Sequence, residues 1–549
     1  MVLPWKGAGD WCRKGRAYGE QGQYDRAIEC YDRALKLNAN TAAAWYHKGL
    51  ALTTSRRYQE AAECLDQGIR IDPDCARLWA ARGQVLYHLR LYEEAAGYCS
   101  QAVKLAPDRV DAWLTRGHAL RNMDRTADAL ACYDQVVTIE PGCIEAWLAR
   151  GTALAIDRQY DAAIENYDRV IALDPRNANA WYARGTIQVL LSRYQDALTS
   201  YDRALAIDLG HADTWSARGC TLATLKRYEE ALISFDRALA IRSNDARILY
   251  NKGLALQNLE RYEEAIGCFD RAFRSNPDLA GIWYHKAVAL KKLKRYDLAL
   301  IGFDRALREN AIDPGIWYWK GRVLFILQRY REAVECFDQA LRLRADYPGA
   351  YYYRGESYYA IGNYEAAVES YQAVVRMEPE NAVAWNNYGN TLYRLERYEE
   401  ALVCYERALE VDPENRQVWN NKANVLSILS HYDQALVCYD QELRANPGSA
   451  DIWCQKGLAL FILGRYGEAI TCYTRALEID PTRATIWSMK GNTLVILGRP
   501  EEALECYEQA LATNPDDPDV LGGIAMALIS LDRSAEAVKY YERLQRMRR

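Results

Sequence analysis

The sequence has few of the residues that most often build catalytic and metal sites. Among 549 residues there are only 6 histidines, and no CxxC pair occurs. Metal sites need clustered ligands, and these histidines are scattered along the chain. No apolar run approaches the roughly 20 residues that a membrane-spanning helix requires. The opening, Met1-Val2-Leu3-Pro4-Trp5, is too short for a signal peptide. We therefore expect a cytoplasmic protein without metal, cofactor or membrane span.

An excess of charge of one sign is also lacking. Lysine and arginine number 69 against 74 acidic residues, which gives a formal net charge of −5. Such a balance creates no long-range field that would attract nucleic acid. The sequence contains no GxxxxGK[ST], HExxH or GxSxG motif, and no segment reads as a strand. These absences predict a protein that is not an enzyme and has no nucleic-acid partner.

What the chain has instead is an uninterrupted repeat of 34 residues. One column of large apolar residues keeps this spacing without insertion or deletion: Trp11, Trp45, Trp79, Trp113, Trp147, Trp181, Trp215, Leu249, Trp283, Trp317, Tyr351, Trp385, Trp419, Trp453, Trp487 and Leu521. Gly or Ala follows four residues later, Ala sixteen residues later, and in most repeats an aromatic residue twenty residues later. Apolar residues at i, i+3, i+4 and i+7 predict two amphipathic helices in each unit. Proline at most repeat ends stops the second helix.

The pattern W-x2-[KR]-G, then A-x3-[YF]-x2-A, then P resembles the tetratricopeptide repeat, and "LERYEEALVCYERALEVDP" (395–413) is similar to the second helix of that family. The resemblance implies an all-α fold, an α-solenoid in which antiparallel helix pairs stack into a right-handed superhelix of about two turns. Residues 1–7 form a lead-in, and residues 8–549 form one continuous array. Its sixteen repeats begin at residues 8, 42, 76, 110, 144, 178, 212, 246, 280, 314, 348, 382, 416, 450, 484 and 518. Each of these residues is position 1 of its repeat.

Four further columns, at positions 7, 23, 25 and 27, bear on stability. Nine of the 15 cysteines occupy position 23, where we expect them to be small apolar filler rather than disulfides. Lys or Arg stands at position 7 in fourteen repeats and an acid at position 25 in thirteen. We expect internal ion pairs such as Lys252 with Asp270; a basic ligand-binding stripe is the alternative. Glu442 replaces the small residue found at Ala408 and Ala476, which predicts a weak link at residues 416–450.

In the tetratricopeptide family, positions 2, 5, 6, 9, 12 and 13 of the first helix line the inner groove. Here their charges nearly cancel. Two neighbouring clusters stand out on them, and they are our candidate peptide-binding residues: Tyr250, Tyr284, Tyr318, Trp319, Tyr352 and Tyr353, followed by Asn386, Asn387, Asn390, Asn420, Asn421 and Asn424. The asparagines resemble the ladder in the groove of O-linked N-acetylglucosamine transferases. The family's clamp for chaperone C-termini is disfavoured because position 5 never holds Lys. The alternative is ordinary variation of the repeat.

Together these features predict a non-catalytic scaffold that binds an extended peptide or partner segment of another protein in its groove. A second hypothesis is a structural module that self-associates through its terminal repeats. A third is a non-catalytic part of a larger enzyme or sensor complex.

Overall fold

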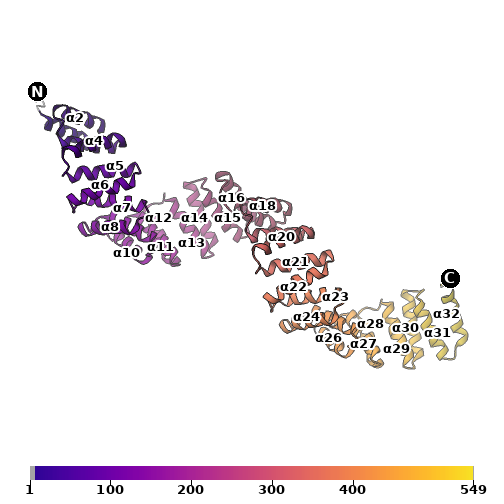
Figure 1. The fold of residues 1–549 in the computed structure, drawn as a ribbon. Coiled ribbons are helices and arrows are strands. Elements are labelled where there is room, and N and C mark those ends of the chain that lie inside the picture. The colour runs from indigo at the N-terminus through magenta and orange to yellow at the C-terminus, as the bar shows by residue number, and fades with distance from the viewer. Residues whose placement is uncertain (1–6, 548–549) are drawn as a thin grey trace. The chain divides into compact units, whose positions relative to one another are not determined.

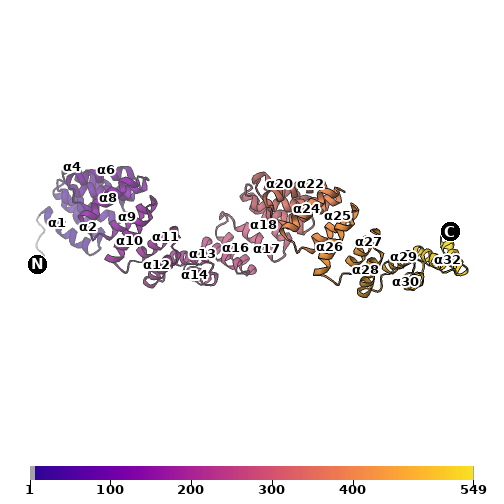
Figure 2. The ribbon, with the colours of Figure 1, turned by 90° about the horizontal axis from the view of Figure 1, so that it is seen from below.

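The computed structural model describes residues 7–547, so all of the predicted lead-in except Gly7 lies outside the described residues. The described residues form two compact units that divide between Ile282 and Trp283, and we describe them separately as unit 1 and unit 2; the helix that begins at Ile282 is described with unit 2. Each unit is all-α, and the described residues contain no strand. Within each unit the helices follow one another as hairpins, and each hairpin packs against the next (Figure 1 and Figure 2).

Unit 1 consists of paired helices that are mostly 13 and 14 residues long. Their bounds are α1 Ala8–Glu20, α2 Tyr24–Leu37, α3 Ala42–Thr54, α4 Tyr58–Ile71, α5 Ala76–His88, α6 Tyr92–Leu105, α7 Val110–Asn122, α8 Thr126–Ile139, α9 Ile144–Ile156, α10 Tyr160–Leu173, α11 Ala178–Leu190, α12 Tyr194–Ile207, α13 Ala212–Thr224, α14 Tyr228–Ile241, α15 Ala246–Asn258 and α16 Tyr262–Ser275.

Unit 2 repeats the same arrangement. Its helices are α17 Ile282–Lys292, α18 Tyr296–Glu309, α19 Pro314–Ile326, α20 Tyr330–Leu343, α21 Pro348–Ile361, α22 Tyr364–Met377, α23 Ala382–Arg394, α24 Tyr398–Val411, α25 Arg416–Ile428, α26 Tyr432–Ala445, α27 Ala450–Ile462, α28 Tyr466–Ile479, α29 Ala484–Ile496, α30 Pro500–Thr513, α31 Pro518–Ser530 and α32 Ser534–Met547. None of the helices within residues 7–547 is long and apolar enough to cross a membrane.

Close packing inside each hairpin explains the glycine column. A Cβ atom added to Gly253 would lie 2.6 Å from Cε1 of Phe269, a distance that real side chains do not tolerate. The repeat that has Ala287 in this column makes room by placing Gly302 opposite it, where an added Cβ would lie 2.8 Å from the Ala287 Cβ. The glycine and aromatic columns are therefore one feature, because the flat ring fills the space that the missing side chain leaves.

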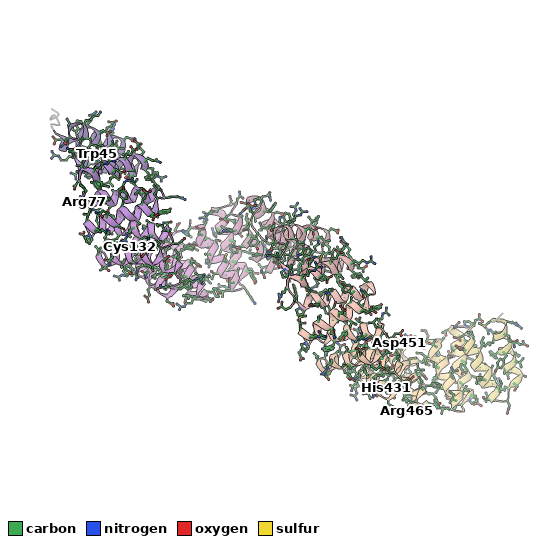
Figure 3. The ribbon with its side chains drawn as sticks, in the orientation of Figure 1. Trp45, Arg77, Cys132, His431, Asp451 and Arg465 are labelled. Atoms are coloured by element: carbon green, nitrogen blue, oxygen red, sulfur yellow. The ribbon has the colours of Figure 1, made fainter. Side chains whose placement is uncertain are left out.

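In most repeats the tryptophan column ties the first helix to the loop before it. Nε1 of Trp45, labelled in Figure 3, donates to the carbonyl of Ala39 at 2.9 Å. Trp419 donates in the same way to Pro413 at 2.8 Å. The indole thus packs between hairpins and also satisfies a carbonyl at the end of the preceding repeat.

The ion pairs between positions 7 and 25 link neighbouring repeats, and this corrects our expectation of pairing inside one repeat. Lys252 Nζ lies 2.5 Å from Oδ1 of Asp236 in the preceding repeat, rather than pairing with Asp270. Lys320 pairs with Asp304 at 2.7 Å in the same way. The reason is geometric: each first helix packs against the second helix of the hairpin before it, so position 25 faces the next repeat.

The residue type at position 23 depends on whether the cation at position 7 of the same repeat is arginine or lysine. Where the cation is arginine, a polar side chain often accepts a second bond, as when Arg150 Nη1 donates to Asn166 Oδ1 at 2.9 Å and Arg184 Nη1 to Ser200 Oγ at 2.9 Å. Guanidinium carries five N–H donors, so it needs more acceptors than an ammonium group does. Most lysine repeats have cysteine there instead. All 15 cysteines lie in the described residues as free thiols, and burial raises the pKa of Cys132 (Figure 3) to about 11.

Candidate functional site

The predicted aromatic residues lie on four first helices. Tyr250 is half-buried on α15 of unit 1, with its ring 6.0 Å from that of Phe269. The other five are half-buried in unit 2 and form what we call the aromatic cluster: Tyr284 on α17, Tyr318 and Trp319 on α19, and Tyr352 and Tyr353 on α21.

Four members of the aromatic cluster are in mutual contact. The Tyr318 ring lies 5.2 Å from Trp319 and 6.3 Å from Tyr353, both edge-on. Tyr353 lies 5.2 Å from Tyr352. Tyr347, which the sequence analysis did not single out, joins them at 4.8 Å from Tyr318. Rings at these separations form a contiguous surface that crosses from one repeat to the next.

Two cations lie on these rings. Lys291 Nζ of α17 is 3.5 Å from the centroid of Trp319, and Arg322 Cζ of α19 is 3.9 Å from that of Tyr353. Arg322 Cζ is also 5.6 Å from Trp319, and its Nη1 donates to the Tyr318 hydroxyl at 3.0 Å. Burial, and then the charges of Arg322 and Lys292, lower the pKa of Lys291 to about 8. The aromatic cluster is therefore locally cationic, although the groove as a whole is nearly neutral.

The next repeat joins this surface through Asn387. Its Nδ2 donates to Glu356 Oε1 at 2.6 Å and to the Tyr352 hydroxyl at 3.2 Å. The hydroxyl of Tyr371 donates to the same oxygen of Glu356 at 2.6 Å. Burial and then the Glu356 charge raise the pKa of Tyr352 to about 12. Asn387 thus holds α23 against α21, and Oε1 of Glu356 accepts from both Asn387 and Tyr371.

Asn421 repeats this pattern one hairpin later. Its Nδ2 donates to Asn390 Oδ1 at 2.9 Å and to Asn386 Oδ1 at 3.0 Å. Tyr405 also donates to Asn390 Oδ1, at 2.9 Å. Asn386 is only 8% exposed, and its Oδ1 joins two consecutive repeats by accepting from Asn421. Asn420 differs, because its buried Oδ1 has no hydrogen-bond partner among the described residues.

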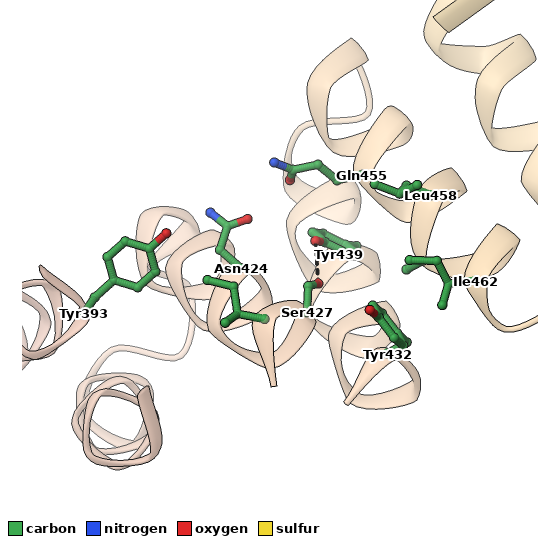
Figure 4. Close-up of a pocket in the computed structure, with 10 residues that line it drawn as sticks. Tyr393, Asn424, Ser427, Tyr432, Tyr439, Gln455, Leu458 and Ile462 are labelled. Carbon is green, nitrogen blue, oxygen red and sulfur yellow. Dashed lines mark hydrogen bonds between the residues drawn. The ribbon is translucent and has the colours of Figure 1, made fainter. Parts of the chain in front are cut away.

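Asn424, the last of the predicted asparagines, lines a cavity of about 290 Å³ between α25 and α27 (Figure 4). Gln455 faces Asn424 across this space, and Ser427 and Tyr439 join its floor through a contact of 3.2 Å between their hydroxyls. The remaining walls are mostly apolar, from Tyr393, Ile428, Tyr432, Leu458, Ala459 and Ile462. Gln455 Oε1 is buried and has no partner within residues 7–547. The cavity therefore combines an apolar wall with an acceptor that lacks a donor.

A simple spacing connects these residues. Position 6 of one repeat reaches positions 5 and 9 of the repeat before it, which lie 35 and 31 residues earlier in the sequence. Lys291 and Arg322 are likewise 31 residues apart. If we had applied these spacings of 31 and 35 residues to the groove columns, the sequence would have predicted that Glu356 contacts Asn387. Gln455 carried no such signal, because its importance comes from lacking a partner.

The family model of the tetratricopeptide repeat matches residues 12–73, 54–110, 157–212, 191–246, 250–315, 303–348, 318–382 and 352–415, which together cover more than half of the chain. The chain belongs to the tetratricopeptide repeat family. A second tetratricopeptide model matches residues 110–153. The model of the cilia and flagella-associated protein 70 C-terminal domain matches residues 384–548. No curated protein matches the chain.

Several solved structures are similar to the chain. The Cut9–Hcn1 hetero-tetramer of APC/C aligns at 16% identity over 88% of this chain and 96% of that one, with a TM-score of 0.36. The complex of Naa15/Naa10 bound to HypK-THB aligns at 14% identity over 98% and 93%, with a TM-score of 0.30. YrrB, a tetratricopeptide protein with an unusual peptide-binding site, aligns at 22% identity over 36% and 99%, with a TM-score of 0.31.

Proposed function

We propose that this tetratricopeptide protein is a non-catalytic scaffold whose unit 2 binds an extended segment of a partner protein. The ligand lies along the groove positions of α19, α21, α23, α25 and α27. The observation that carries the proposal is the cavity beside Asn424, where the unpaired Oε1 of Gln455 is buried within an otherwise mostly apolar wall. A buried acceptor without a donor costs roughly 1–3 kcal/mol, and a peptide N–H in the cavity would relieve that cost once the Gln455 amide turned its buried Oε1 toward it.

The neighbouring contacts support the same role. Asn387 and Asn421 bridge consecutive repeats, so the groove surface is organised before a ligand arrives. A preorganised surface loses less conformational entropy on binding. Tyr and Trp, which dominate the preceding repeats, are the usual anchors of protein interfaces. One end of an extended peptide would therefore lie on the aromatic side chains, and its other end would lie at the cavity.

An array of short peptides, each acetylated and amidated, tests this proposal with the full chain as the analyte. Asn424→Leu combined with Gln455→Leu fills the cavity and removes the acceptor. We expect this variant to weaken binding of the selected peptides about tenfold, while its thermal melting stays close to that of the wild type.

The matched control is Thr152→Leu with Ala183→Leu, which places the same bulk at the equivalent positions in unit 1. This control should leave binding unchanged. Equal affinity of the peptides for both double variants and the wild type would show that the cavity is not the binding site.

A further inference from the structure

We propose that Lys291 and Arg322, held against Trp319 and Tyr353, bind a carboxylate group of the partner peptide. The carboxylate comes from an Asp or Glu side chain or from the peptide's C-terminus. This inference rests on the proposed function and adds the chemical class of the ligand at the aromatic cluster.

The geometry brings two cations onto one aromatic surface. Lys291 Nζ lies 3.5 Å from the centroid of the Trp319 ring, and Arg322 Cζ lies 5.6 Å from the same centroid. Both side chains are half-buried, so water screens their mutual repulsion less than it would on an open surface. The lowered pKa of Lys291, caused by burial and then by Arg322 and Lys292, reflects this repulsion.

No carboxylate among the described residues forms an ion pair with Lys291 or Arg322, and the buried Nε of Arg322 has no hydrogen-bond partner there. Asp313 and Glu356, two acids of this region, each use one carboxylate oxygen in another contact. Asp313 caps α19 by accepting from the Gly315 amide at 2.7 Å, and Glu356 accepts from Tyr371 and Asn387. A ligand carboxylate would compensate the two cations that have no carboxylate partner among the described residues, and guanidinium is well suited to binding a carboxylate through two parallel bonds.

A peptide fits this site better than a nucleic acid does. A polyanion needs a continuous basic track, whereas the groove residue of the next repeat here is the acid Glu356. The arrangement also differs from the family's clamp for chaperone C-termini, because its cations stand at positions 12 and 9 and position 5 carries tyrosine. The site therefore suits one carboxylate flanked by apolar or aromatic side chains.

The test uses the tightest-binding peptide of the array as its parent, in three forms: with an internal Glu and blocked termini, with Gln in its place, and with Gln and a free C-terminal carboxylate. We expect one carboxylate form to bind the wild-type chain about tenfold more tightly than the blocked Gln form. The form that gains identifies the source of the carboxylate. Lys291→Met, which keeps the apolar stem over Trp319, should abolish that gain.

Lys294→Met is the matched control, because it removes the same charge from an exposed residue at position 15, which is not one of the groove positions. It should preserve the gain, and Arg322→Lys should retain part of it. Equal binding of all three forms, with continued sensitivity to the Asn424→Leu and Gln455→Leu pair, would overturn the carboxylate site and leave the groove intact. Absence of any binding peptide would overturn both proposals. Tighter binding of a single-stranded oligothymidine, lost in Lys291→Met, would show that the site takes a polyanion instead.

Discussion

Helix α19 carries one tryptophan–lysine contact in each of two settings. On the side that packs against the preceding hairpin, Lys320 lies over Trp317 at 5.7 Å, and Asp304 neutralises its ammonium at 2.7 Å. On the groove side, Trp319 receives Lys291 at 3.5 Å, and no carboxylate of the described residues completes the pair. We call the first contact closed, because a carboxylate neutralises its lysine, and the second open, because no carboxylate of the described residues does so. The two surfaces carry the same residue types. They differ in whether the lysine has a carboxylate partner within the described protein: it has one on the packing surface and none on the candidate binding surface.

The largest effect should come from breaking a closed pair. Lys252→Glu would place two carboxylates together at Asp236, and we expect a loss of about 2 kcal/mol in the free energy of unfolding. Lys226→Glu, on the inter-helix turn of the preceding repeat, is the surface control. Denaturant unfolding measures both. Recovery of stability in the double variant Lys252→Glu with Asp236→Lys would confirm the partner, whereas an unchanged single variant would show that the pair is only a solvated contact.

Glu442 sharpens the comparison, because it is an unpaired charge at a packing position rather than in the groove. Its Oε2 is buried without a partner in the described chain, and burial raises its pKa above 4.5, with Arg416 opposing. Below pH 4.5 the carboxyl is protonated in both folded and unfolded states, so the cost is absent. As the pH rises through the raised pKa of the folded state, stability is lost.

We therefore expect Glu442→Ala, which restores the residue found at Ala408 and Ala476, to stabilise the protein by about 1–2 kcal/mol at neutral pH. The gain should shrink below pH 4.5. Amide exchange across residues 416–450 is the local measurement. A gain that does not depend on pH would mean that packing, and not the charge, is responsible.

A smaller gain in stability should follow from adding an acid at position 25 where a cation at position 7 of the next repeat has none. Arg116 faces Ser100, where most repeats have an acid, and its Nε is buried without a partner among residues 7–547. Ser100→Asp should raise stability by about 1 kcal/mol, as judged by the melting temperature. Thr474→Asp opposite Lys490 is the parallel case. Destabilisation by both substitutions would contradict the pairing of positions 7 and 25 across repeats.

Much of the fold followed from the sequence because each column has a local cause. The 34-residue period and the spacing of apolar residues predicted the helix pairs, and the structure confirms an all-α arrangement of hairpins. The partner of Lys252 was predicted wrongly, because position 25 falls within reach of two repeats and only packing decides between them. The buried, unpaired Glu442 was visible as one charged residue in a column of small ones, and the weak link predicted there stays a prediction.

The candidate site was less accessible to sequence reasoning. The groove columns named the tyrosines and asparagines, yet the columns do not show which amides are occupied. Asn387 and Asn421 bond to neighbouring repeats, and the buried amide acceptors without a partner among residues 7–547 belong to Asn420 and Gln455. Lys291 and Arg322 were recognised only as groove charges, since their meeting on Trp319 depends on side-chain placement across repeats.

The most direct test of the distinction between closed and open cations is the thermal melting of two truncations, Lys320→Met and Lys291→Met, measured against the wild type. Both remove a lysine charge and keep an apolar stem over a tryptophan. We predict that Lys320→Met lowers the melting temperature, because Asp304 loses its partner, while Lys291→Met leaves it unchanged or raises it by relieving repulsion with Arg322. Equal destabilisation by the two truncations would mean that Lys291 is a structural residue and would contradict the account.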